Sequence, residues 1–226
     1  MTRTRAVVLD VDGTLVDSER DGHRVAFNRA FGEAGLSDHW DVDTYGRLLR
    51  VTGGRRRLDL WFRSRGHAPT AAAALAAVVH ARKTELMRDL AVQHRVPARA
   101  GVRELLDHLA ASGLALHVAT TGTRAWVEPL LEDLFGPVFG HVVTGDDVAT
   151  LKPHPAAYEE VLRRAGLSAD QAVAVEDSRN GLVAATAAGL RCVVVRNSYT
   201  AAQDFSGADL VVDEFTDPAL LTALAG

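Results

Sequence analysis

The sequence predicts an α/β protein: a doubly wound parallel sheet with a helical segment inserted after its first strand. Two observations favour this fold class. Beyond Pro97, short apolar runs typical of strands alternate with segments of helix length. Between residues 17 and 95 the pattern is helical and contains no convincing strand. We therefore expect residues 1–16 and 96–226 to form the α/β core, and residues 17–95 to form a helical cap.

The first strand ends in two acids. Residues 6–9 form an apolar run expected to be buried on both faces, as in the middle of a parallel sheet, and Asp10 and Asp12 follow it. Ligands bind at the carboxyl ends of such strands, and carboxylates this close repel each other unless a cation, a shared proton or a cationic substrate is present. The plain alternative is a turn in which Asp12 and Gly13 only end the strand.

Four helices are expected in the cap. Glycine and proline clusters separate segments with helical spacing, which are residues 18–34, 41–49, 56–65 and 70–90. The cap leaves the core just beyond Asp12. We therefore expect it to cover the acidic site like a lid.

The remainder of the core alternates strands and helices, which implies right-handed crossovers between parallel strands. The first strand must join this sheet, because one apolar strand is not stable alone. We expect strands at residues 115–120, 141–144, 172–175, 192–195 and 210–212, and helices at residues 101–112, 124–134, 156–165 and 181–188.

Two further polar clusters directly follow predicted strands. Thr120 and Thr121 can present hydroxyls and amides to an anion before the next helix begins. Glu176 and Asp177 end an apolar strand and invite a metal ion. Helix capping is the plain alternative for one threonine, and also for Asp177 or Ser178.

Lysine usage draws attention to Lys152. The chain has 25 basic residues, of which only Lys83 and Lys152 are lysines. An ammonium is a compact point charge that fits where a planar guanidinium does not. Lys152 lies in a loop at residues 151–155 whose prolines exclude a helix interior. We therefore expect a binding role for Lys152, whereas for Lys83, on a predicted helix, chance retention is an equal alternative.

Composition argues against several functions. The net charge of −4 and the short basic cluster at residues 55–57 give no footprint for nucleic acid. No stretch approaches the ~18 apolar residues of a membrane span, and the first residues lack a signal-peptide pattern. The single cysteine, Cys192, lies in an apolar run and has no disulfide partner within the chain. We expect a cytoplasmic protein that binds neither nucleic acid nor membrane.

Taken in order, the polar clusters are residues 10–14, Thr120, Lys152 and Glu176-Asp177. This ordered set resembles the four motifs of the haloacid dehalogenase superfamily of phosphohydrolases, and it covers nearly the whole chain. The helical insert resembles the cap of the group containing phosphoglycolate phosphatases and β-phosphoglucomutase. Segments 17–24, 40–45, 53–54 and 199–205 are similar to CbbY-type sugar bisphosphate phosphatases. The resemblance implies a Rossmann-like core and xylulose 1,5-bisphosphate as the substrate.

The resemblance also implies roles for the core residues. Asp10 would be the nucleophile that forms an aspartyl-phosphate, and Asp12 would protonate the leaving oxygen and later deprotonate water. Thr120, the amide of Thr121 and Lys152 would bind the transferring phosphoryl oxygens. Mg²⁺ would be held by the Asp10 carboxylate, the Asp12 main-chain carbonyl, Glu176 and Asp177.

The cap would bind the rest of the substrate. Glu19 and His23 are four residues apart on one helix face, and Lys83 on the fourth cap helix is expected to meet them above the site. Arg57 would grip a second, nonreacting phosphate, with a solvated basic helix face as the alternative. The expected substrate-binding residues are Glu19, His23, Gly53, Gly54, Arg57, Lys83, Thr121 and Asn180.

The chain departs from the pattern of these relatives in two places. Residues 55 and 56 are both arginine where Lys-Glu is common, and Gly122 stands where a polar residue is common. Both departures bear on the substrate rather than on the phosphoryl chemistry.

Three functions compete. The first is a monomeric, Mg²⁺-dependent phosphatase acting on a small phosphorylated sugar, in particular a bisphosphate. The second is a mutase of the β-phosphoglucomutase kind, which would use the same aspartates and return the phosphoryl group to sugar. The third is a noncatalytic module that binds a phosphorylated metabolite, and the intact motifs argue against it. A phosphonatase would need a Schiff-base lysine in the cap, for which only Lys83 is available.

Overall fold

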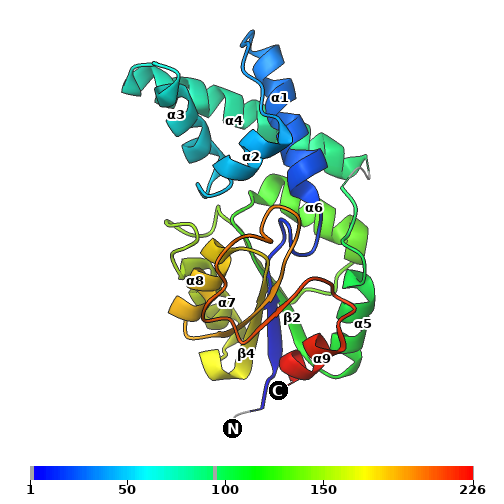
Figure 1. Ribbon diagram of the computed structural model, residues 1–226. Helices are drawn as coiled ribbons and strands as arrows, with labels where there is room; N and C mark the ends of the chain where they lie inside the picture. The colour runs from blue at the N-terminus through cyan, green and yellow to red at the C-terminus, as the bar shows by residue number, and fades with distance from the viewer. Residues whose placement is uncertain (1–2, 94–95, 226) are drawn as a thin grey trace.

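The computed structural model describes residues 3–93 and 96–225 of the chain (Figure 1). Its described strands form one parallel sheet in the order β3-β2-β1-β4-β5-β6. The strands are β1 Ala6–Leu9, β2 Ala115–Ala119, β3 His141–Val143, β4 Ala172–Glu176, β5 Arg191–Val195 and β6 Leu210–Val212. This topology confirms the predicted fold class.

The strand order reverses beside β1, the fully buried central strand. Leu9 is in register with Val118 on β2 and with Val175 on β4. The next residue, Asp10, donates its amide to the Val175 carbonyl at 3.0 Å. The register therefore places Asp10 level with the acids that end β4, at the point where open α/β sheets bind ligands.

Each face of the sheet packs against its own helices (Figure 1). Val7 and Leu9 belong to a core shared with helices α5, α6 and α9, whereas Ala6 and Val8 face α7 and α8. Cys192 is fully buried on the second face, as its apolar surroundings predict. The helices are α5 Val102–Ala111, α6 Arg124–Phe135, α7 Ala156–Ala165, α8 Arg179–Ala187 and α9 Pro218–Ala225.

The inserted helices lie together beyond the carboxyl ends of the strands (Figure 1). An aromatic core joins them, including Phe27, Phe31, Trp40 and Phe62. Helix α4 also packs against α6 of the α/β core. These elements are a π-helical turn at Glu19–His23, α1 Arg24–Glu33, α2 Val42–Leu48, α3 Gly54–Ser64 and α4 Pro69–Val92.

Local details differ from the sequence-based expectations. The first cap helix is not one α-helix, because residues 19–23 form a π-helical turn, a feature common at functional sites. The terminal helix α9 was not predicted, since its eight residues are too few to show a clear period; it buries Leu220 and Leu224. A short 3₁₀ turn at Ala169–Gln171 was also not predicted. Within the described ranges, no helix has the length and apolar character needed to cross a membrane.

Candidate active site

The loops after four neighbouring strands lie at the end of the sheet that faces the cap (Figure 1). Residues from these loops line one pocket. Asp10 follows β1, Thr121 follows β2, Lys152 lies in the loop after β3, and Asp177 follows β4. All four residues line a cavity of about 390 Å³. The fold thus brings together motifs that lie far apart in the sequence.

Lys152 is a buried residue that lines this pocket. Its Nζ donates hydrogen bonds to Asp10 Oδ1 at 2.7 Å, Glu176 Oε1 at 2.5 Å and the Ala119 carbonyl at 2.8 Å. Tyr158 donates its hydroxyl to the same Glu176 oxygen at 2.6 Å. Burial disfavours the charged ammonium, but the Asp10 and Glu176 carboxylates hold the pKa of Lys152 above its ordinary value. Lys152 therefore remains a cation between two acids.

Three buried carboxylates form a cluster, and two of them bond this lysine. Asp10, Glu176 and Asp177 each offer an oxygen, and these oxygens lie within 4.8 Å of one another. Burial raises the pKa of Asp10 to about 8 even though Lys152 is bound to it. Burial, followed by the Asp10 and Glu176 charges, also raises the pKa of Asp177 well above its ordinary value. The single Lys152 ammonium therefore does not balance the negative charge that the three carboxylates would carry if all were ionised.

Asp177 is held by a residue that the sequence analysis missed. Asn197 donates from Nδ2 to Asp177 Oδ2 at 2.7 Å and to the Gly13 carbonyl at 3.2 Å. Gly13 has φ of +81°, and a Cβ at this position would overlap the Asp177 carboxylate. Only glycine therefore permits both the turn after β1 and the approach of the second acid. Ser178, not Asp177, caps helix α8 by accepting from the Gly181 amide.

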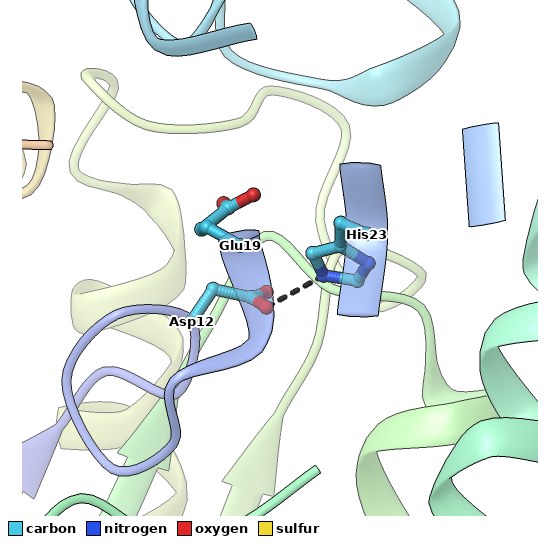
Figure 2. Close-up of side chains that lie close together, drawn as sticks. All are labelled: Asp12, Glu19 and His23. Atoms are coloured by element: carbon cyan, nitrogen blue, oxygen red, sulfur yellow. Dashed lines mark hydrogen bonds and ion pairs between the residues drawn. The ribbon is translucent and has the colours of Figure 1, made fainter. Parts of the chain in front are cut away.

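Asp12 faces the cap rather than the acid cluster. Figure 2 shows the His23 ring directed at the Asp12 carboxylate. His23 Nε2 lies 2.6 Å from Asp12 Oδ1, and Ser18 donates its hydroxyl to the same oxygen. Burial alone would raise the pKa of Asp12, but His23, Ser18 and the Lys83 ammonium outweigh it and hold the pKa below its ordinary value. The two aspartates of the first motif therefore have different environments: the pKa of Asp10 is raised and that of Asp12 is lowered.

The threonines after β2 form the side of the pocket. Thr120 is 1% exposed, and its Oγ1 accepts the Gly122 amide at 3.0 Å. Thr121 lines the cavity beside Lys152. The structure thus places both predicted phosphate-binding threonines at the end of β2, close to Asp10.

Arg57 is buried in the cap and forms hydrogen bonds with residues 45–51, which precede it in the chain. Its Nε donates to the Leu48 carbonyl at 3.1 Å, and its two terminal nitrogens donate to Val51 O and to the Tyr45 hydroxyl, both at 3.2 Å. Arg57 also lines the 390 Å³ cavity. The alternative of a solvated Arg57 is wrong, whereas its neighbours at residues 55 and 56 are exposed. Contact with a second phosphate stays a prediction.

Glu19 and Lys83 complete the cap side of the site. Tyr45 donates its hydroxyl to Glu19 Oε2 at 2.5 Å. The Lys83 ammonium lies 5.0 Å from the centroid of the Phe27 ring, and burial lowers its pKa to about 8. A small chamber of about 60 Å³ connects these groups; it is lined in part by Asp12, Glu19, His23, Gly53, Gly54 and Lys83. The expected meeting of cap residues above Asp12 is present.

Asn180 joins the core to the cap. Its Nδ2 donates to Thr52 Oγ1 at 2.8 Å, and the residue lines the 390 Å³ cavity. The structure therefore gives Asn180 a contact with the loop before α3. Substrate binding by Asn180 stays a prediction.

The sequence analysis gave no role to four residues that hold side chains of the site, which are Ser18, Tyr45, Tyr158 and Asn197. Asn197 carried a usable signal, because it follows β5 at the same edge of the sheet as the other motifs. The other three lie on or beside helices, where a hydroxyl has no distinctive spacing. Their roles depend on which side chains the fold places opposite them.

With this geometry in view, comparison with known proteins is informative. Residues 4–189 match the family of haloacid dehalogenase-like hydrolases. The CbbY protein of Rhodobacter capsulatus is 41% identical and covers 91% of both chains. A phosphoglycolate phosphatase of Salmonella typhi is 31% identical over 97% of this chain and 92% of its own.

Comparison with solved structures finds the same relatives. Crystal structures of CbbY from Rhodobacter sphaeroides include one with phosphate, at 38% identity, and one of a mutant with xylulose 1,5-bisphosphate, at 37% identity. Each has a TM-score of 0.85 and matches 95% of this chain and 96% of the other.

The chain belongs to the haloacid dehalogenase-like hydrolases, since the match covers most of its length and includes all four strand-end motifs. Within that family it belongs with the CbbY proteins, to which it is similar along nearly its whole length. It is accordingly a phosphatase, an enzyme that hydrolyses phosphoric monoesters.

Proposed function

We propose that this protein is a Mg²⁺-dependent phosphatase of a small sugar bisphosphate, such as xylulose 1,5-bisphosphate, and acts through an aspartyl-phosphate. The observation that carries the proposal is the Asp10 carboxylate, which lies in the cavity between Lys152 and the β4 acids, with Asp12 on the cap side. The bisphosphate is supported by the CbbY structure that contains it.

The acid cluster fits a hard divalent cation. Carboxylate oxygens are the ligands that Mg²⁺ prefers, and the raised pKa values of Asp10 and Asp177 indicate a deficit of positive charge there. Asp10, Glu176, Asp177 and the main-chain carbonyl of Asp12 would hold the ion. When bound, Mg²⁺ would reduce the repulsion between the nucleophile and a dianionic phosphate.

Asp10 would attack phosphorus and form a new P–O bond, while the bond to the sugar oxygen breaks. The pKa of Asp12 is held below its ordinary value, so Asp12 is ionised in the free protein and would take up a proton in the substrate complex. It would then give this proton to the leaving oxygen, so that the sugar leaves as an alcohol. Asp12, now ionised, would take a proton from water, and the water oxygen would attack the aspartyl-phosphate. This step would release inorganic phosphate and restore both aspartates.

Lys152 and the threonines would stabilise the transferring group. The Lys152 ammonium already bonds Asp10 and would share its charge with the phosphoryl oxygens. Thr120 would donate its hydroxyl and Thr121 its amide. The cap residues Glu19, His23 and Lys83 would contact the sugar, because they line the chamber above Asp12.

Phosphate release from a panel of sugar mono- and bisphosphates tests the proposal, with Mg²⁺ present or chelated. Mg²⁺-dependent release that is fastest with the bisphosphate, and absent from Asp10→Asn, is the expected result. Release from monophosphates alone would remove the assigned substrate, and no release from any compound would refute the proposal. Gel filtration and cell fractionation test the accompanying expectation of a monomeric, cytoplasmic protein.

A mutase activity in addition to the phosphatase activity is the second candidate, favoured by the placement of His23 and Lys83 in the chamber next to Asp12. Groups in this position could hold a sugar hydroxyl where a phosphatase admits water. Product analysis separates the two, since a mutase yields an isomeric sugar phosphate and a phosphatase yields free phosphate.

A further inference from the structure

One aromatic side chain of the core touches the cap residue that holds Asp12. Trp126 on helix α6 is 2% exposed, and its ring lies edge-on to His23 with 5.0 Å between centroids and 87° between planes. Trp126 belongs to the α/β core, whereas His23 lies in the π-helical turn that enters the cap. This contact therefore links the two parts of the molecule beside the site.

His23 is fixed by hydrogen bonding on one side only. Its Nε2 lies 2.6 Å from Asp12 Oδ1, and its Nδ1 is buried with no hydrogen-bond partner among the described residues. An imidazole held by one hydrogen bond can still rotate about its broad terminal torsion. The Trp126 ring packs against the imidazole and removes that freedom, so the indole sets the orientation of His23.

Gly122 provides the space for this indole. A Cβ at Gly122 would lie 2.7 Å from Trp126 Cζ2 and 2.7 Å from Val127 Cγ2, closer than real side chains approach. The Gly122 amide also donates to Thr120 Oγ1, so the glycine belongs to the loop predicted to bind phosphate. The glycine that departs from the family pattern is thus explained: Trp126 fills the volume that a side chain would need.

We propose that Trp126 is a positioning residue that seats His23 against Asp12 and so aligns the proton donor with the leaving oxygen. The inference rests on the proposed function, in which Asp12 protonates that oxygen. Gly122, Trp126, His23 and Asp12 form a continuous set of contacts from the phosphate-binding loop to the acid. The same indole therefore contacts both the loop proposed to bind the phosphoryl group and the histidine that holds the proposed proton donor.

A leaving-group comparison tests this role. The value of kcat/KM covers the steps through departure of the leaving group, and p-nitrophenolate departs without needing a proton. Trp126→Leu should lower kcat/KM for the sugar phosphate about 10- to 100-fold, because misplacing a general acid by about 1 Å has effects of this order. Its kcat/KM for p-nitrophenyl phosphate should fall less than about threefold, since general-acid help matters little there.

Three companion variants make the test specific. Trp126→Phe keeps an aromatic ring against His23 and should recover most of the lost rate on the sugar phosphate. Trp126→Met fills more of the space of the indole than leucine does but lacks a ring, and it should reproduce the selective loss even if Trp126→Leu fails to fold. Trp61→Leu removes a partly exposed cap tryptophan that contacts Trp40 and Asp38 and lines neither cavity that contains Asp12, so it should behave as the parent.

The outcomes separate the inference from the proposed function. A parent enzyme that hydrolyses both substrates, with equal losses for both in Trp126→Leu and Trp126→Met, would overturn the positioning role and leave the phosphatase intact. Unchanged kinetics in both variants would overturn it as well. A parent enzyme that hydrolyses neither substrate would refute the proposed function, and the inference with it.

Discussion

Two helix glycines offer a matched test of how tightly the acid cluster is packed. Gly181 lies in the first turn of α8, and a Cβ built there would overlap all three terminal atoms of the Glu176 carboxyl group. Gly32 lies in α1, and a Cβ built there meets no atom within 4 Å. The same Gly→Ala change is thus accommodated in one helix and not in the other.

The expected magnitudes follow from these surroundings. Gly32→Ala should add about 1 kcal/mol of stability through helix propensity, which raises Tm by about 2–4 °C in a protein of this size. Gly181→Ala gains the same term but forces Glu176 away from Lys152 and Tyr158. Overpacking costs about 1–3 kcal/mol and disruption of a buried ion pair about 3–5 kcal/mol. A net loss of at least about 3 kcal/mol, or about 6–12 °C in Tm, is expected.

Thermal unfolding with and without Mg²⁺, together with phosphate release, provides the assay. Gly181→Ala should lose about 100-fold in kcat, because a shift of about 1 Å at a reacting centre has this effect. It should also lose most of the rise in Tm that Mg²⁺ gives the parent. Gly32→Ala should keep full activity. A Gly181→Ala protein with the parent's Tm and activity would refute the assigned packing of Glu176.

The pKa of Lys83 falls from 10.5 to about 8 on burial, so the unfavourable buried charge is fully present below pH 8 and is relieved as pH rises to 10.5. The parent should therefore gain up to about 3 kcal/mol relative to Lys83→Met across this range, measured by urea unfolding. Asp12→Asn should lower kcat on a sugar phosphate about 100- to 10,000-fold, while Mg²⁺ still raises Tm, because a main-chain carbonyl is the proposed ligand. Burial lowers the pKa of His117, so the free energy of unfolding of the parent should fall as pH drops below 6.5. His117→Gln should lose less of it, measured by urea unfolding over the same pH range. An equal loss in the parent and in His117→Gln would contradict this prediction.

The position of the acids could be read from the sequence because its cause is local. An apolar run followed by a carboxylate predicts a buried strand ending in Asp10, and parallel pairing brings every such strand end to one edge. Lys152 stood out because the chain is nearly devoid of lysine. The core motifs therefore lie together as predicted.

The contacts of the cap were harder to predict. Arg57 was expected at a second phosphate, which stays a prediction, and the sequence did not predict its three hydrogen bonds to the backbone before α3 and to the Tyr45 hydroxyl. A guanidinium has five donors, and the sequence does not show how many are used within the protein. The direction of the Arg57 side chain depends on how helices α2 and α3 pack.

The sequence by itself determined the fold class and the chemical content of the strand ends, because strand and helix periodicity and residue type are properties of short segments. Only the tertiary structure decided which groups hold those residues in place. Trp126 meets His23, and Asn197 meets Asp177, across contacts between elements distant in the chain. Such contacts depend on the relative positions of whole helices and loops, which the packing of several hydrophobic faces fixes together.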